Sequence, residues 1–209
     1  MHLKNALVVG AGALLLSYGA VQAQDAFNRD PTKIQAGTYK LDPEHSKITW
    51  SVSHLGFSTY VGQFAGGTGQ LTIDPETPQT AKLDVTVNTA NVGTLNKKLD
   101  DHLKSADFLD VANHPTATFR AKGVTLTGPR TADIAGELTL RGVTRPVTIK
   151  AVFNQSGLGP VDKTYTLGFD GETKIRRSEF GVSYGLPAVG DEVTLRLEAE
   201  FKAQQAPKG

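Results

Sequence analysis

The sequence predicts an all-β protein: an eight-stranded antiparallel β-barrel with a short helical insert. Apolar and polar residues alternate in run after run, which is the period of strands with one buried face. Turns rich in glycine and proline separate these runs, so that neighbouring strands can pair as hairpins. The alternation is lost in residues 94–110, where apolar residues recur at helical spacing. Eight antiparallel strands close into a barrel that side chains can fill or that can hold one small ligand.

The clearest strand is residues 46–55. Ile48, Trp50 and Val52 share one face, and His54 continues their parity, which places an imidazole at the end of an apolar face. Glycines at positions 62, 66, 67 and 69 are expected either to kink a strand or to let another backbone approach closely. The other expected strands cover residues 38–41, 71–73, 83–87, 116–127, 132–140, 146–154, 164–174 and 192–202.

Within residues 94–110, Thr94 and Ser105 are predicted to be N-caps of two short helices. His114 precedes Pro115, and a residue before proline is pushed towards extended geometry, so the helical segment should end there.

Residues 1–23 have the features of a secretory signal peptide. Lys4 precedes an apolar run over residues 6–16, and small residues at Val21 and Ala23 suit a signal peptidase. The run is short for a membrane span, and the absence of cysteine argues against a disulfide scaffold or a lipoprotein anchor. We therefore predict cleavage after Ala23 and export to the periplasm.

Cleavage would leave 186 residues, a usual size for one domain. Lys4 is the only Lys, Arg, Asp or Glu removed, so of 22 basic and 21 acidic residues, 21 of each would remain. This balance predicts neither a nucleic-acid partner nor stable membrane insertion. We expect a flexible N-terminal lead-in over residues 24–37, the barrel over 38–203 and a C-terminal tail over 204–209.

Several short stretches add a resemblance to these predictions. In chain order they are Tyr39–Asp42 with His45-Ser46 and His54, Gly62–Phe64, Asp101–Asp110, His114–Phe119, Gly136–Val147 and Arg177–Gly181. Each is weak alone, but in this order and spacing they resemble the YceI-like family of bacterial polyisoprenoid-binding proteins, from about residue 38 to residue 201. The resemblance implies a secreted, lipocalin-like barrel whose apolar channel holds an isoprenoid or similar amphiphilic lipid.

Parity alone does not separate a filled barrel from a hollow one, and small barrels are generally filled. The resemblance favours a hollow barrel binding an isoprenoid quinone, prenyl diphosphate or fatty amide, with no other cofactor. The predicted ligand-binding residues are Ile48, Trp50, Val52, His54, Phe64, Leu71, Val85, Phe119, Leu138, Phe153, Leu167, Phe169, Arg176 and Arg177.

Arg176 and Arg177 are the first candidates to bind a polar lipid head group, because guanidinium groups bind phosphate through two hydrogen bonds. One of the two should face inward if the strand persists, and the sequence does not say which. Arg141 and Arg145, which flank the Gly142 turn, are the second candidates. The alternative for all four is ion pairing with Glu179, Glu137 or Asp133.

We predict no catalytic or metal site. The histidines are dispersed, without the close ligand spacing that zinc sites usually show, and a trio of Ser, His and Asp can be assembled from almost any sequence. One alternative is a metal-dependent or hydrolytic stress-response enzyme that uses His54, His102 and His114. Another is a solid-cored interaction module. Transport, storage and detoxification of a lipid would look alike in the sequence, which also leaves a homodimer open.

Overall fold

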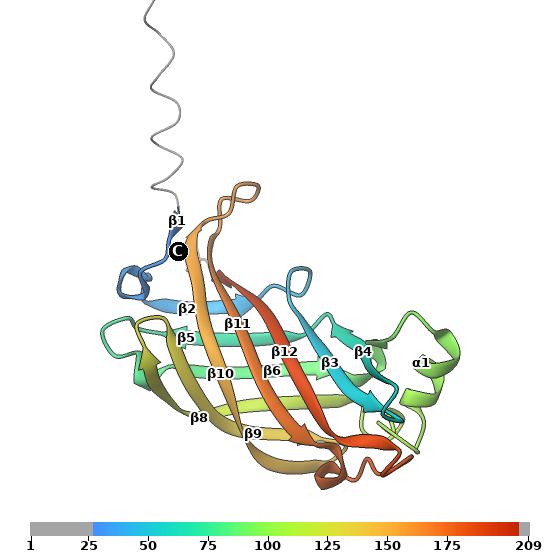
Figure 1. The fold of residues 1–209 in the computed structure, drawn as a ribbon. Coiled ribbons are helices and arrows are strands. Elements are labelled where there is room, and N and C mark those ends of the chain that lie inside the picture. Colours follow the sequence, from blue (N-terminus) through green and yellow to red (C-terminus); the bar gives the residue numbers. More distant parts are fainter. Residues whose placement is uncertain (1–26, 205–209) are drawn as a thin grey trace, which may run out of the picture.

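The computed structural model describes residues 27–204, so the predicted signal peptide (residues 1–23) and most of the predicted tail lie outside the described residues. These residues form a closed eight-stranded antiparallel barrel with one α-helix, which confirms the predicted fold class (Figure 1).

Each barrel strand pairs with the next one along the chain, and the last pairs with the first. Phe201 of β12 pairs with Leu41 of β2, and Leu195 pairs with Trp50 of β3, so β12 closes the barrel. Three barrel strands are interrupted and carry two labels each: β2 (Gly37–Leu41) with β3 (Lys47–His54), β4 (Ser58–Ala65) with β5 (Thr68–Ile73), and β6 (Lys82–Asn88) with β7 (Val92–Gly93). The other five are β8 (Thr116–Gly128), β9 (Thr131–Leu140), β10 (Val143–Leu158), β11 (Tyr165–Arg176) and β12 (Val189–Ala203).

The interruptions lie beside one another across the three strands. Gly66, in the left-handed region at φ 71°, and Gly67 separate β4 from β5, so these glycines kink a strand, one of the two roles the sequence left open. Asn91, in the 3₁₀ turn η3 (Thr89–Asn91) between β6 and β7, donates from Nδ2 to the Ala65 carbonyl at 3.0 Å. The wall of the barrel therefore bends along one line.

The helical insert differs from its prediction. It contains one helix, α1 (Lys97–Lys104), whose N-cap is Asn96 rather than Thr94. The Asn96 side chain accepts a hydrogen bond from the Leu99 N–H, and Thr94 instead binds Asp100. Ser105 is the C-cap, and its hydroxyl donates to the His102 carbonyl, so no second helix starts there.

The predicted lead-in is partly wrong, because residues 27–37 belong to the fold. Strand β1 (Phe27–Asn28) pairs with β10, and a 3₁₀ turn, η1 (Pro31–Lys33), follows it. Ile34 is buried in a core cluster, which explains why this polar stretch docks on the barrel. The cluster contains Ile34, Tyr39, Leu71, Phe153, Leu167 and Phe201.

The two ends of the barrel carry different structures (Figure 1). The α1 end, as we name it, holds the β3–β4 turn, α1, the β9–β10 turn and the β11–β12 connection with η4 (Arg177–Phe180). The η1 end holds η1, the β5–β6 connection with η2 (Pro78–Thr80), the β8–β9 and β10–β11 turns and the end of β12.

Candidate ligand-binding site

The inner faces of the strands surround an apolar cavity of about 730 Å³. This volume falls within the range of small-molecule sites in proteins. The lining extends along the barrel from Leu126 at the η1 end, 57% exposed, to Tyr184 at the α1 end, 51% exposed. A long apolar chain could therefore lie along the barrel.

The inward-facing residues show that the barrel is hollow. Ile48, Trp50 and Val52 line the cavity and are only partly buried, although the barrel wall screens them from outside. Leu138 and Leu195 on other strands behave in the same way. In a close-packed interior such side chains would have almost no accessible surface. The solid-cored alternative therefore does not describe this barrel.

Large aromatic side chains leave the cavity open because they lie against its wall. A Cβ atom added at Gly62 would come within 2.2 Å of the Trp50 ring, so the indole lies over the Gly62 backbone. Phe119 lies over Gly136 in the same way, at 2.4 Å. Each glycine thus accommodates the ring of a neighbouring strand. Short side chains add further space: paired inward positions on β9, β10 and β11 are Ala132, Ala151 and Gly171.

Most of the predicted binding residues line this cavity. Leu167 is an exception: it faces inward but is fully buried in the core cluster, where it fills space instead of bounding it. Arg176 is also outside the cavity, on the outer side of β11. Those that line it are Ile48, Trp50, Val52, His54, Phe64, Leu71, Val85, Phe119, Leu138, Phe153, Phe169 and Arg177.

At the α1 end the cavity has an aromatic mouth. The His102 ring contacts those of Phe108 and Tyr184 edge-on, with both centroid distances 5.0 Å. The ring centroids of His54 and Tyr60 lie 6.0 Å apart. Sequence reasoning missed Phe108 and Tyr184, because the turns and loops that carry them lack strand periodicity, although the helical spacing of His102 was visible.

Arg177 faces inward, but the structure corrects its predicted role. Its guanidinium group donates to four backbone carbonyls of the β11–β12 connection and β12, those of Val182, Tyr184, Val189 and Gly190, at 2.8–3.0 Å. Burial lowers its pKa, with the charge of Asp191 acting in the opposite direction. With most of its donors used, Arg177 holds this loop in place instead of offering a fork to a head group.

The other candidate arginines also form no ion pair with Glu179, Glu137 or Asp133 within residues 27–204. Arg141 donates to the carbonyls of Gly181 and Ala106 and thereby joins the β9–β10 turn to the helical insert and the β11–β12 connection.

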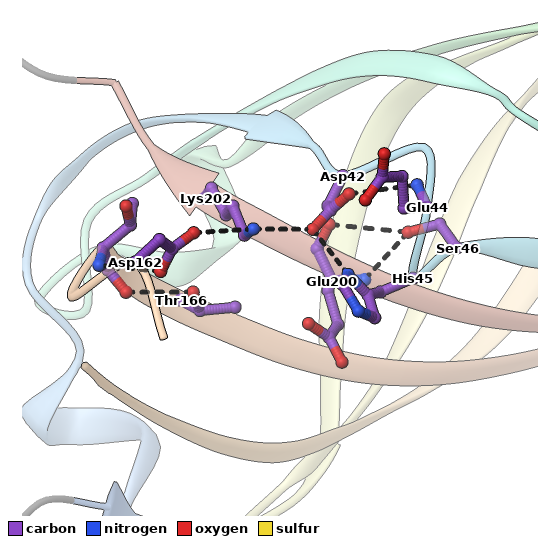
Figure 2. A network of polar contacts seen from close by, with 9 residues as sticks. Asp42, Glu44, His45, Ser46, Asp162, Thr166, Glu200 and Lys202 are labelled. Carbon is purple, nitrogen blue, oxygen red and sulfur yellow. Dashed lines mark hydrogen bonds and ion pairs between the residues drawn. The ribbon is translucent and has the colours of Figure 1, made fainter. Parts of the chain in front are cut away.

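A polar network lies at the kink between β2 and β3 (Figure 2). The buried Asp42 carboxylate accepts hydrogen bonds from Lys202 at 2.9 Å, His45 at 2.8 Å and the Glu44 N–H at 3.0 Å. Burial opposes ionisation of Asp42, but these donors outweigh it and hold its pKa well below the usual range. Lys202 also binds Asp162 of the β10–β11 turn at 2.8 Å, so the network fastens three parts of the chain together.

The structure does not gather the three histidines of the alternative metal hypothesis. His54 and His102 line the cavity, whereas His114 packs on Gly142 outside it. Within residues 27–204, the group with metal-ligand spacing is Asp42, His45 and Glu200, whose ligand atoms lie within 4.8 Å. The Lys202 ammonium already supplies the positive charge beside Asp42, so the network is explained without a metal.

Comparison with known proteins gives the family. The family model for the YceI-like domain matches residues 39–201 of the sequence. The chain belongs to the YceI-like family. Its relatives include a UPF0312 protein of Azotobacter vinelandii, 37% identical over 94% of this chain and 96% of that one. Another, from Pseudomonas paraeruginosa, is 41% identical over 79% of this chain and 86% of that protein.

Solved structures of other bacterial proteins have the same fold. BcnA of Burkholderia cenocepacia aligns with a TM-score of 0.70 at 25% identity, covering 77% of this chain and 98% of that one. The YceI protein of Campylobacter jejuni aligns with a TM-score of 0.66 at 29% identity, covering 73% and 90%. Among residues 27–204, the helices are all too short or too polar to cross a bilayer.

Proposed function

We propose that this YceI-like barrel is a carrier or sequestering protein that binds a polyisoprenoid or similar amphiphilic lipid in its cavity. The observation that carries the proposal is the partial exposure of inward-facing apolar residues to a space of about 730 Å³. Each CH₂ group of a ligand buried there contributes about 0.8 kcal/mol. A prenyl chain could thus bind through apolar contact alone.

The proposal includes export to the periplasm, which rests on the features of residues 1–23, and a binding role without catalysis. A domain of Saccharophagus degradans described as polyisoprenoid-binding and implicated in plant cell wall breakdown has a similar fold, with a TM-score of 0.60 over 81% of this chain and all of that one. At 13% identity this likeness speaks to the fold, and the lipid class rests on the cavity and on the sequence resemblance.

Native mass spectrometry of protein purified gently from the exporting host tests the ligand directly. We expect a discrete adduct whose fragments show a prenyl series. An unliganded mass that stays unchanged after incubation with prenyl alcohols, prenyl diphosphates and isoprenoid quinones would contradict the proposal.

A pair of variants tests the cavity itself. Ala151→Phe places a ring in the lumen and should weaken prenyl alcohol binding at least about tenfold, because it displaces several methylene contacts. Ala135→Phe, on the exposed outer face of the neighbouring strand β9, should bind as the unaltered protein does. Equal affinities for the two variants would place the ligand elsewhere.

A further inference from the structure

Strands β10 and β11 stop pairing with each other before they reach the α1 end, which leaves a seam in the barrel wall. The ladder between β10 and β11 ends at Lys150 and Glu172, although both strands continue towards the α1 end. Over residues 143–149 β10 pairs with β9 alone, and over residues 173–176 β11 pairs with β12 alone. A side-chain bond bridges the seam, from the Thr173 hydroxyl to the Thr148 carbonyl at 2.8 Å. Unpaired strand edges of this kind present free backbone donors and acceptors.

A polar cleft of about 550 Å³ lies at this seam. Val147, Thr173 and Ile175 line both the cleft and the apolar cavity, so the two spaces share a wall. This wall is mostly apolar, whereas the outer lining of the cleft is charged. A molecule with an apolar tail and a polar head would find both environments within one molecular length.

The cleft carries an excess of free positive charge. Lys174 pairs with Glu192 at 2.8 Å, and Glu172 pairs with Arg196 at 3.2 Å, so these groups compensate one another. Three further cations line the cleft: Arg145, Lys150 and Arg176. Within residues 27–204 none of the three forms an ion pair, and Arg145 donates only to the neighbouring Thr144 carbonyl.

Glu179 is the one acidic residue lining the cleft that has no ion-pair partner among the described residues. Three cations against one carboxylate leave a net positive field at a site with two guanidinium groups. Guanidinium groups bind phosphate oxygens through paired hydrogen bonds, and they remain charged at any physiological pH.

We propose that this cleft is the head-group site of the bound lipid and that it selects an anionic head, a phosphate or diphosphate, through Arg145 and Arg176. The inference rests on the proposed function, because the tail would occupy the central cavity. The head group would contact Arg145 and Arg176, outside the barrel wall, and not the inward-facing Arg177. The head would then lie at the seam near the α1 end, and the tail would run towards the η1 end.

The test compares three probes on the purified full-length mature protein: a prenyl diphosphate, the parent prenyl alcohol of the same chain length, and inorganic diphosphate. We expect the prenyl diphosphate to bind most tightly. Replacing both Arg145→Gln and Arg176→Gln should weaken its binding about tenfold or more, because charge-assisted hydrogen bonds are lost. Binding of the alcohol should not change.

Two further variants sharpen the test. Glu179→Gln removes the opposing charge and should tighten prenyl diphosphate binding several-fold. Arg120→Gln removes an exposed arginine of β8, paired with Asp84 away from the cleft, and should leave all three affinities unchanged. Circular dichroism and urea titrations confirm that each variant is folded.

The outcomes separate this inference from the proposed function. Unchanged prenyl diphosphate affinity in the double variant, or equal losses for diphosphate and alcohol, would overturn the head-group site while lipid binding stands. Inorganic diphosphate binding as tightly as the prenyl compound would also overturn it, since the cleft would then take a free anion. If the unaltered protein bound no prenyl alcohol, the carrier proposal itself would fail.

Discussion

Two parts of the barrel interior share the same alternation of inward and outward residues but differ in packing. Towards the η1 end, Tyr39, Leu167 and Phe201 pack together in the core cluster beside the cavity and are at most 4% exposed. Towards the middle and the α1 end, Trp50 and Leu138 face inward at equivalent strand positions but border empty space. Period-two alternation therefore predicts which residues point inward. Whether their side chains pack against one another depends on their size and on the residues around them.

The difference follows from what covers each part. At the η1 end, Ile34 enters the core from the N-terminal segment. The Phe169 ring contacts the Phe153 ring at a tilt and the Phe201 ring edge-to-face, with centroid distances of 5.5 and 6.1 Å. In the hollow part, the largest rings lie back over glycines. Packed aromatic contacts stabilise the scaffold, and the other part remains free for a ligand.

The largest expected effect comes from a matched pair of leucines. Leu167→Ala should lower the free energy of unfolding by about 3–4 kcal/mol, because it creates a cavity in a fully packed site. Leu138→Ala should cost only about 1 kcal/mol, since that side chain already borders a void. Urea titration measures both. Similar losses for the two variants would show that the interior is uniformly packed in solution.

A hollow part need not be loosely held, and the second pair of variants tests this. Arg177→Gln should destabilise the protein by about 2–4 kcal/mol, because several carbonyls of the β11–β12 connection lose a buried charged donor. Arg176→Gln, on the outer side, should stay within about 0.5 kcal/mol. Hydrogen exchange should also quicken in residues 181–190 for Arg177→Gln alone. Unchanged exchange there would contradict the pinning role.

The Asp42 network should show a smaller, pH-dependent effect. Asp42→Asn should cost about 2–3 kcal/mol at neutral pH, because Lys202 keeps Asp162 but loses its buried partner. A carboxyl whose folded-state pKa is lowered contributes stability above its unfolded pKa of about 3.9 and loses it as the pH falls further. The difference in free energy of unfolding between the unaltered protein and the variant should therefore shrink below about pH 4. Urea titrations at several pH values measure it. A difference that does not depend on pH would show that the charge of Asp42 is not involved.

His45 acts in the opposite direction within the same network. The hydrogen bond and charge of Asp42 raise its pKa, so its contribution is complete below its unfolded pKa of about 6.5 and declines as the pH rises. Urea titrations between pH 5 and 9 should show a slight decline in the free energy of unfolding as the pH rises. The His45→Gln variant should not show this decline. A decline that persists in the variant would assign it to another group.

Much of the fold could be predicted from the sequence because inward and outward residues alternate along nearly every strand. The register that closes the barrel, such as Leu195 against Trp50, follows from that alternation and from short turns. The N-terminal segment could not be predicted in this way. Ile34 is a single apolar residue in a polar stretch, and its burial depends on a tertiary pocket that no local pattern shows.

The site was predictable in its lining and not in its polar groups. Parity identified inward positions such as Val52 and Phe119, but it could not show that Arg177 would use its donors on backbone carbonyls. Nor could it bring Arg145 of β10 and Arg176 of β11 to one cleft, because that depends on where the ladder between their strands ends.

The smallest expected effects concern the polar atoms of two aromatic residues. Tyr39, in the packed part, donates its hydroxyl proton to the Gln35 carbonyl, and burial raises its pKa to about 12. The Trp50 indole N–H, in the hollow part, is buried without a partner among residues 27–204. Tyr39→Phe should therefore cost about 1 kcal/mol, whereas Trp50→Phe should change stability by less than about 0.5 kcal/mol, because the lost apolar contact is offset by removal of an unsatisfied donor. Thermal unfolding of the lipid-free proteins distinguishes the two. A loss at Trp50 as large as that at Tyr39 would mean that the indole N–H has a partner in solution, and that the hollow part is more ordered than its packing indicates.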